Sequence, residues 1–212
     1  MMQFAHRDLR QARGQTFYKL LGSGKGFGFN PLPDWSVYSL LQVWKSERDA
    51  DEFFATAPIV ERYRAHSAEF WTLYLKNVSA KGAWSGGNPF EAASDLDAAN
   101  SYLAVITRAR IKAKHLASFW RFVPRAQKPL ERSDGLIFTK GIGELPVIQM
   151  ATFSLWESEA AMKSYAYKSA EHREAIAKTR ELGWYQEEMF SRFQPYRSVG
   201  TWNGKSILDF GF

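Results

Sequence analysis

Few side chains in this sequence could carry chemistry. There is no cysteine, which excludes disulfides, thiolate ligands and a cysteine nucleophile. No serine stands in a Gly-x-Ser-x-Gly turn. Glu187 and Glu188 are adjacent in an expected strand, where neighbouring side chains point to opposite faces. These features argue against a hydrolase with an activated nucleophile and against a glycosidase with two facing carboxylates.

Among the four histidines, His172 has the surroundings that favour a site. It shares one helical face with Ala175, Ile176 and Thr179, and the apolar members predict that this face looks inward. A zinc site needs further ligands at suitable spacing, which are missing, whereas one axial histidine suffices for haem. Two interpretations stay open: a core histidine bonded to a backbone carbonyl, and an axial ligand of haem iron.

The glycines that alternate over residues 22–28 raise the question of a phosphate-binding loop. The third glycine of a dinucleotide fingerprint falls on Phe27 or Phe29, and Lys25 is followed by Gly26 where a Walker A loop needs Ser or Thr. The segment 30–34 contains two prolines and leads into residues rich in β-branched and aromatic side chains. The pattern predicts a long hairpin between two strands.

The composition indicates a folded chain with a large core, since 45% of its 212 residues are hydrophobic and 16% aromatic. The net charge of +6 comes without a nucleic-acid-binding motif, so no nucleic-acid partner is expected. Residues 112–124 predict a basic, aromatic, amphipathic helix, whose apolar side either packs on a sheet or rests on a membrane. Neither a membrane span nor a secretory signal is visible, and we expect a cytoplasmic protein, peripheral to the inner face of the membrane if that helix rests on it.

Two halves of the sequence resemble each other, and this repeat predicts the fold. Trp44 aligns with Trp156, and the residues GAWSG at 82–86 align with GTWNG at 200–204. Each half reads strand, hairpin, strand, helix, strand. In the second half a strand at 102–110 and the basic helix come first, which gives the βαββαβ order of a ferredoxin-like unit. We therefore expect an α+β fold in which two ferredoxin-like repeats form an α+β barrel.

The expected boundaries follow from the same alignment. The first repeat covers residues 1–87, a polar linker covers 88–101, and the second repeat, the expected haem-binding half, covers 102–212. The first half shows strands only at about 16–21, 35–44 and 69–80, and residues 2–12 resemble the end of a helix. We therefore expect the first repeat to lack its N-terminal strand, through truncation rather than by design.

Long motifs of the chain resemble the spheroidene monooxygenase family of the dimeric α+β barrel superfamily. They include FYKLLGSGKGFGFNPLPDWSVYSLLQVW, SAKGAWSGGNPF, GLIFTKGIGELPVIQMATFSLW and HREAIAKTRELGWYQEEMFSRF. The resemblance implies a monooxygenase that oxidises the C-2 end of acyclic carotenoids with haem b, O₂ and an external electron donor such as a ferredoxin. It also implies that His172 is the catalytic residue and the proximal ligand of the haem iron.

Two basic residues are candidates to bind the haem propionates. Arg192 lies between Phe190 and Phe193 on a packed strand, where a charge needs a partner, and a structural ion pair is its alternative role. Lys140 is the weaker candidate, because Lys19 occupies the comparable position of the other half, which favours a structural role for both.

Two rival functions remain. One is a cofactor-free monooxygenase of the same superfamily that acts on an aromatic substrate, and the other is a non-enzymatic carrier of haem or an apolar ligand. For the oxygenase the expected partners are a carotenoid, a reductase or ferredoxin, and a membrane contact through the basic helix. In that case we expect the hairpin at 22–28 to be a mobile loop at the entrance of the substrate pocket. The barrel closes either within one chain or between two copies of the chain, so a homo-oligomer is one of two alternatives.

Overall fold

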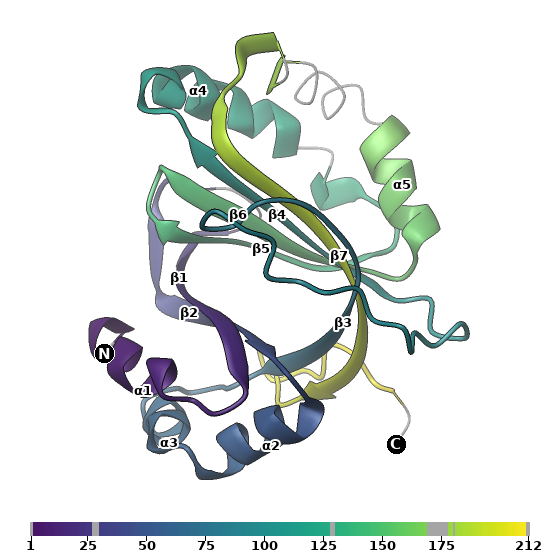
Figure 1. Cartoon of the computed structure of the whole chain (residues 1–212). Helices are drawn as coiled ribbons and strands as arrows, with labels where there is room; N and C mark the ends of the chain where they lie inside the picture. Colours follow the sequence, from purple (N-terminus) through teal and green to yellow (C-terminus); the bar gives the residue numbers. More distant parts are fainter. Residues whose placement is uncertain (1, 27–29, 128–129, 169–177, 180, 211–212) are drawn as a thin grey trace. The chain divides into compact units, whose positions relative to one another are not determined.

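The computed structural model describes residues 2–26, 30–127, 130–168, 178–179 and 181–210 (Figure 1). Two compact units interleave along the chain. Unit 1 comprises Met1–Leu20, Leu40–Tyr74 and Arg197–Phe212, and unit 2 comprises Leu21–Ser39 and Leu75–Tyr196. The units do not coincide with the expected halves 1–87 and 102–212, and those boundaries stay a prediction.

The helices and strands are described in chain order. In the first half they are α1 (Met2–Arg10), β1 (Gln15–Gly24), β2 (Pro33–Trp44), α2 (Glu47–Thr56), α3 (Pro58–Ala65) and β3 (Thr72–Gly82). In the second half they are β4 (Leu103–Ile111), α4 (Leu116–Gln127), β5 (Leu136–Leu145), β6 (Gln149–Trp156), α5 (Glu159–Lys168) and β7 (Tyr185–Val199). Short 3₁₀ turns, Ala113–His115 and Leu130–Arg132, flank α4.

The strands of the described residues form one sheet in the order β2-β1-β5-β6-β4-β7-β3. This sheet and its helices confirm the α+β class. β1 and β2 are neighbours in this sheet, and the Lys25 N–H donates to the Leu32 carbonyl at 2.9 Å, while residues 27–29 of the expected hairpin lie outside the described residues. In the described part of the chain, no helix is long and apolar enough to span a bilayer.

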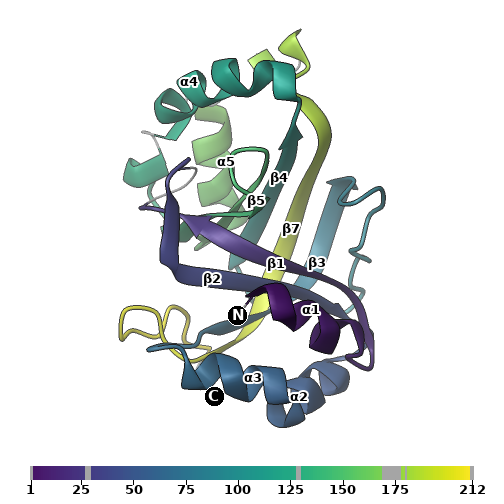
Figure 2. The same cartoon turned by 90° about the vertical axis from the view of Figure 1, so that its left-hand side faces the viewer.

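Unit 1 has a core between three helices and parts of β1 and β2. Leu9 and Ala5 of α1 contact a group formed by Phe53, Ile59 and Val60, and all five side chains are buried. Figure 2 shows α1 beside α2 and α3. The break between α2 and α3 follows from Pro58, which cannot continue a helix but is well suited to begin one.

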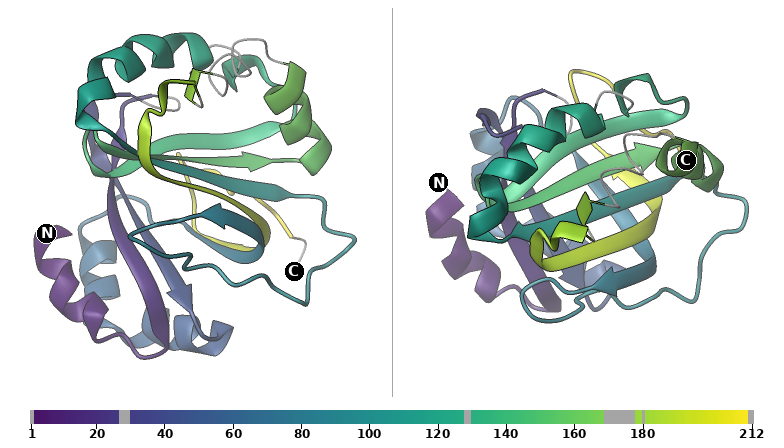
Figure 3. Two further views of the ribbon diagram at one scale, coloured as in Figure 1. Left: turned by 45° about the horizontal axis from the view of Figure 1, so that its top comes forward. Right: turned by 90° about the horizontal axis from the view of Figure 1, so that it is seen from above.

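Unit 2 contains four antiparallel strands in the order β5-β6-β4-β7, with α4 and α5 on one face (Figure 3). The apolar side chains Phe119, Phe122 and Val123 of α4 lie in a buried cluster with Ile111 of β4 and Met150 of β6. The apolar side of the basic helix therefore packs on the sheet, as the first of its two interpretations expects.

The other helix of unit 2, α5, covers the opposite end of the same face. Its Met162 lies in a second buried cluster with Leu103 and Val105 of β4 and Trp156 of β6. Tyr165 stacks on Trp156 with ring centroids 5.5 Å apart, and burial raises the pKa of its phenol to about 12. The two helices are thus anchored at the two ends of β4.

The aligned motifs at 82–86 and 200–204 fold into turns with matching backbones. Gly82 and Gly200 have φ of 100° and 89°, and Ser85 and Asn203 have φ of 61° and 52°. In one turn the N–H groups of Ser85 and Gly86 donate to Glu187 at 3.1 and 2.8 Å. In the other turn, Asn203 and Gly204 donate to Glu69 in the same way.

The expected linker, 88–101, has no helix or strand, but it is held in place. Gln194 of β7 accepts from the Asp97 N–H at 2.8 Å and donates to the carbonyls of Asp97 and Asn100 at 2.8 and 3.0 Å. The Ala93 N–H donates to the Asn77 carbonyl at 2.8 Å. The segment is therefore an ordered cover of β3 and β7 rather than a loose tether.

Candidate functional site

Among the described residues, neither α4 nor α5 covers the middle of the helix-bearing face of unit 2. On β4, Leu103 and Val105 lie in the α5 cluster and Ile111 lies in the α4 cluster, whereas Thr107 between them is exposed. The partner of Thr107 on β7 is Phe190, which is 41% exposed. An exposed threonine and phenylalanine in the centre of a sheet mark a surface that neither helix covers.

Small residues continue from Thr107 across the other strands, where Thr152 is half-buried and Gly141 is buried. Thr107 pairs with Thr152 of β6, and Thr152 pairs with Gly141 of β5. Cross-strand partners share one face of a sheet, so Gly141, Thr152, Thr107 and Phe190 form one row that we call the platform. Its first three members carry little side chain, so a flat apolar ligand could lie against the strands between the two helices.

Arg192 lies at the edge of the platform, on the same face as Phe190. Its guanidinium donates to Glu159 at the start of α5 at 2.6 Å and to the Ser79 hydroxyl at 2.9 Å. The hydrogen bond from Lys163, together with the charges of Lys163 and Arg192, holds the pKa of Glu159 below its usual range despite some desolvation. The side chain of Arg192 is 28% exposed, so it can reach a further anion.

Lys140 lies on the opposite face of this sheet. It pairs with Phe153, whose neighbour Thr152 belongs to the platform, and successive strand residues face opposite sides. The ammonium of Lys140 is buried and binds the Asp34 carboxylate at 3.0 Å. The structure therefore does not bring Lys140 and Arg192 together, although both were expected to bind one cofactor.

His172, the expected iron ligand, lies outside the described residues. Along the chain it stands between α5, which packs at the Leu103 end of β4, and Trp184, which packs at the Ile111 end. The other histidines do not form a site. His6 bonds the Tyr18 hydroxyl at 3.0 Å, and His66 bonds the Arg62 carbonyl at 2.8 Å.

The remaining histidine, His115, lies in the 3₁₀ turn before α4. In the parts of the chain that the structure describes, no group of three or more His, Cys, Asp or Glu could hold a metal ion. The histidines found there thus have local bonds or lie apart from one another.

Trp184 borders the platform and has an unused donor. Its ring is 3% exposed and contacts Phe119 and Phe122 of α4 at centroid distances of 5.7 and 5.8 Å. The indole N–H is buried and has no hydrogen-bond partner among the residues that the structure describes. Because a buried unsatisfied donor is costly, this N–H is a candidate to bind an acceptor of a ligand. The sequence contains no signal for this role or for the platform, since both depend on strand register.

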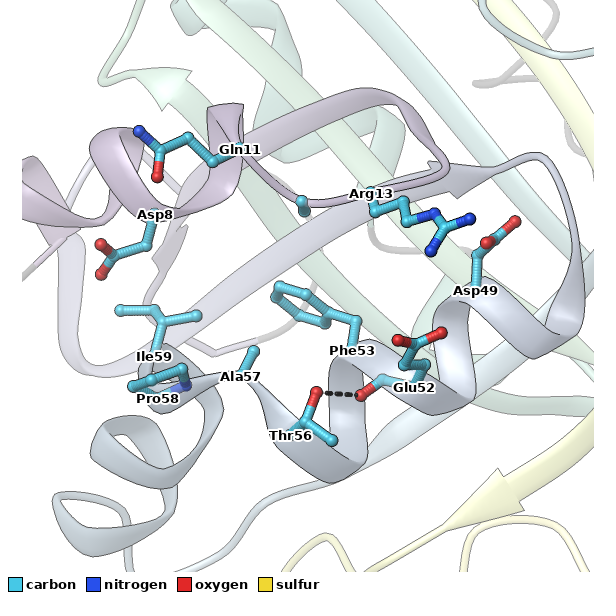
Figure 4. Close-up of a pocket in the computed structure, with 11 residues that line it drawn as sticks. Asp8, Gln11, Arg13, Asp49, Glu52, Phe53, Thr56, Ala57, Pro58 and Ile59 are labelled. Atoms are coloured by element: carbon cyan, nitrogen blue, oxygen red, sulfur yellow. Dashed lines mark hydrogen bonds between the residues drawn. The ribbon is translucent and has the colours of Figure 1, made fainter.

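Unit 1 has a cavity of about 370 Å³ between α1 and the α2–α3 pair (Figure 4). Phe53, Ile59 and Ala57 line its apolar part, and Asp8 and Asp49 stand at its polar part. Asp8 is paired with Arg62, and Asp49 accepts from the Ser46 hydroxyl at 2.6 Å. The first pair links α1 to α3 and the second belongs to the N-cap of α2, and the residues that line the cavity include no histidine and no activated nucleophile.

Comparison with known proteins agrees with the motifs. A spheroidene monooxygenase of Rhodobacter capsulatus is 37% identical over 208 residues, which are 98% of this chain and 86% of the relative. The spheroidene monooxygenases of Cereibacter sphaeroides and Rubrivivax gelatinosus are 37% and 34% identical, over 89% and 91% of this chain and 58% and 73% of their own. No family model matches the chain.

Among solved structures, a protein of Fusobacterium nucleatum covers 93% of this chain and 83% of its own at 7% identity and a TM-score of 0.45, too weak a similarity to carry an argument. The sequence relatives decide the class: all are named monooxygenases, which confirms that the chain is an enzyme of that class. More narrowly, the chain belongs to the spheroidene monooxygenase family, as its motifs predicted.

Proposed function

We propose that this chain is a haem-dependent monooxygenase that oxidises the C-2 end of an acyclic carotenoid at the platform. Membership of the spheroidene monooxygenase family supports the substrate class. The row Gly141–Thr152–Thr107–Phe190 is the structural observation that carries the proposal, because three of its members have small side chains, Thr107 and Phe190 are exposed, and two apolar clusters border it. It could accept both a macrocycle and the end of a polyene.

A monooxygenase transfers one oxygen atom of O₂ to its substrate and reduces the other to water. The two electrons that this requires must come from an external donor, for which a ferredoxin or a reductase is the proposed partner. Haem would supply the activation of O₂ when it is bound. The part of this chain is to hold the cofactor, orient the substrate and exclude water.

The residues present fit a haem on the helix-bearing face. Arg192 is partly exposed at the platform edge and suits a propionate. We propose His172 as the axial ligand. In support, Val60, its counterpart in the repeat, is 1% exposed and packed in a core.

Lys140 does not share this fit. It lies on the other face of the sheet, and its buried ammonium is already neutralised by Asp34. We therefore propose Arg192, and not Lys140, as the propionate partner. Arg192 keeps a second, structural role through Glu159, because Arg197 makes an equivalent contact with Glu47 at the start of α2 at 3.4 Å.

We also propose that the architecture consists of two ferredoxin-like repeats of an α+β barrel, the first lacking its N-terminal strand. The matching turns at 82–86 and 200–204 and the pairing of Gly22 with Gly143 support an internal twofold relation, since both sets join aligned residues. We further propose that the enzyme is cytoplasmic and contacts the membrane peripherally, and the apolar substrate supports the membrane contact. If a second copy of the chain completes the barrel, the molecular mass measured in solution will be that of a dimer.

The proposal is tested by the absorption spectrum of the purified chain after titration with haem. We expect one equivalent to give a Soret band that His172→Ala loses, while His66→Ala keeps it, because His66 bonds only a local carbonyl. If the chain is instead a cofactor-free monooxygenase, titration of the wild type with haem should give no saturable Soret band. A band that persists in His172→Ala would remove the axial ligand from the proposal. A haem-loaded chain that leaves acyclic carotenoids unchanged would favour the carrier.

A further inference from the structure

The positive charge of the chain is concentrated in one segment of unit 2. The chain has 28 basic and 22 acidic side chains, and residues 98–130 contain seven of the basic ones and none of the acidic ones. The rest of the chain therefore has 21 basic and 22 acidic side chains, a net charge of −1, so this segment carries the whole positive excess. A local excess of one sign attracts partners of the opposite sign and speeds their association.

The free charge of this segment lies around the start of α4. Arg108 of β4 is 3% exposed and already paired with two glutamates. In contrast, Lys114 in the 3₁₀ turn and Arg121 of α4 are exposed, and Lys112 before the turn is half-buried. Among the residues that the structure describes, none of these three cations forms an ion pair. Their charge is therefore available to a partner.

The outer side of α4 carries two charges separated by small residues. Lys114, Ser118 and Arg121 follow the i, i+4, i+7 spacing, so they lie on one side of the helix. Ala117 and Ser118 between the charges are exposed, and the Ser118 hydroxyl donates to the His115 carbonyl at 2.9 Å. We call Lys114, Ala117, Ser118 and Arg121 the cationic face. Its small side chains allow a partner to approach closely between the two charges.

The cationic face does not suit insertion into a membrane. An interfacial helix buries large apolar side chains in the lipid. The described part of residues 98–130 contains no exposed large hydrophobic side chain, and Phe119, Phe122 and Val123 of α4 are buried in the cluster with β4 and β6. A surface of charges and small residues, whose apolar side is already covered, instead suits a hydrated acidic protein.

The position of α4 indicates which kind of acidic protein fits. On the inner side of the helix, Phe119 contacts Trp184 with ring centroids 5.7 Å apart, and Trp184 borders the platform. Trp120 contacts the same phenylalanine at 5.5 Å and donates to the Val147 carbonyl at 3.0 Å. Only the thickness of one helix, about 10 Å, separates the cationic face from this aromatic cluster. A partner bound to the face would be close enough to supply electrons to a cofactor on the platform.

We propose that the cationic face is the docking site of the electron donor, a small acidic iron–sulfur protein of the ferredoxin type. Carboxylates of the donor would lie against Lys114 and Arg121, with Lys112 at the rim. Two reduced donors would each be oxidised by one electron. These two electrons, with two protons from water, reduce to water the oxygen atom of O₂ that the substrate does not receive. The identity of the donor rests on the proposed function, whereas the charge of the face does not.

The probe is a [2Fe–2S] ferredoxin with an acidic surface, titrated in its oxidised form into the chain without haem. Isothermal titration calorimetry in about 20 mM and about 150 mM NaCl measures the dissociation constant. We expect binding at the lower salt concentration that weakens about tenfold at the higher one, because salt screens exposed charges. The double variant Lys114→Glu, Arg121→Glu should weaken binding at least about tenfold at the lower salt concentration.

The matched control is the double variant Lys45→Glu, Arg48→Glu, which makes the same change of charge on exposed residues of unit 1. It should change the dissociation constant less than about twofold. Both double variants should unfold close to the temperature of the wild type, since all four residues are exposed. Equal weakening by the two double variants would reduce the effect to net charge and overturn the docking site. Absence of binding in about 20 mM NaCl would overturn it as well.

A second measurement separates this inference from the proposed function. Reduction of the haem-loaded chain by the reduced ferredoxin should be at least about tenfold slower in Lys114→Glu, Arg121→Glu, while the Soret band stays as in the wild type. A chain that binds the ferredoxin as expected but takes up no haem would contradict the haem proposal and support the docking face. A haem-loaded chain that does not bind the ferredoxin would overturn the docking face alone.

A lipid surface gives a different result. Phosphatidylcholine–phosphatidylglycerol vesicles would then bind the wild type and not the variant Lys114→Glu, Arg121→Glu, while the ferredoxin would bind neither. That outcome would assign the cationic face to an anionic membrane and overturn docking of a protein.

Discussion

At the scale of single residues, the platform depends on how little side chain its members have. Thr107 stands in the centre of a sheet face where buried aliphatic residues are the rule, and both of its strand neighbours on that face are buried. A threonine there adds little to the core but leaves room for a ligand. Filling that room should therefore affect ligand binding more than folding.

We predict that Thr107→Phe weakens haem binding at least about tenfold, with a change of less than about 1 kcal/mol in the free energy of unfolding. The matched control is Arg110→Phe, since Arg110 is exposed on the opposite face of the same strand. Haem titration followed in the Soret region and urea unfolding measure the two effects. Equal affinities of the two variants would contradict a ligand on the platform.

The ion pair of Asp34 and Lys140 gives a prediction for pH. The hydrogen bond from the Ser36 hydroxyl and the one from Lys140 lower the pKa of Asp34 from 3.8 to about 2. A carboxyl whose pKa is lowered by folding stabilises the folded state above its unfolded pKa and loses that contribution as the pH falls through its folded pKa. The contribution should therefore be complete above about pH 4 and fade towards pH 2.

Asp34→Asn should cost about 1–2 kcal/mol of unfolding free energy at pH 7, with little difference from the wild type near pH 2. Unfolding in urea at a series of pH values measures this. Ser133→Ala, a hydroxyl change away from the pair, serves as the control. A difference that is constant from pH 7 to pH 2 would show that the charge of Asp34 does not contribute.

At the scale of elements, the turns at 82–86 and 200–204 follow β3 and β7, and each has a glycine at positive φ where the strand ends. Gly82 and Gly200 have positive φ, and a Cβ at either position would collide with a backbone carbonyl, that of Glu188 for Gly82 and that of Phe70 for Gly200. The carboxylates of Glu187 and Glu69 complete the turns. Burial opposes the charge of Glu187, but the Gly86 and Ser85 N–H groups and Arg108 outweigh it and lower its pKa.

Gly82→Ala and Gly200→Ala should each destabilise the chain by more than about 2 kcal/mol, because the backbone must shift and the φ is unfavourable. Gly87→Ala is the control, since nothing lies within 4 Å of its Cβ position and its φ is not positive. Thermal unfolding of the three variants measures the effect. Similar stability of Gly82→Ala and Gly87→Ala would contradict the close approach of the turn to β7.

Sequence periodicity predicts these elements well and their contacts poorly. The apolar and aromatic runs locate β1, β2, β4 and α4 to within a few residues, because local pattern decides strand and helix. The split at Pro58 was not expected, although proline gives a physical reason for it. The face on which a strand residue lies depends on register. Because of the bulge between Leu136 and Phe138, Lys140 lies on the opposite face from Leu136, although simple alternation along the strand would put both on one face.

The candidate site could be predicted only in part, because contacts between strands depend on register, which local sequence pattern does not give. Arg192 was expected to need an anionic partner, and Glu159 provides one. The pairing of Lys140 with Asp34 joins residues far apart in sequence, and no local pattern predicts it. Thr107, Thr152 and Gly141 have no chemical signature of their own and acquire a role only when three strands align them.

At the scale of the whole molecule, the family of the chain and the surface of unit 2 both agree with a monooxygenase that binds an apolar substrate. The relatives are named spheroidene monooxygenases. Unit 2 has a surface between α4 and α5, the platform, with Arg192 at its edge. Oxygenation of a carotenoid by the chain is therefore the property that matters.

The most direct measurement is the mass of the pigments in cells that accumulate an acyclic carotenoid and express this chain, with and without an N-terminal extension that supplies a strand for β2. The account predicts oxygenated pigment from the extended chain, none from its His172→Ala variant, and unaltered production from His66→Ala. Unchanged pigment from the extended, haem-loaded chain in the presence of O₂ and a ferredoxin would contradict it. Oxygenation that survives His172→Ala would contradict the role of haem.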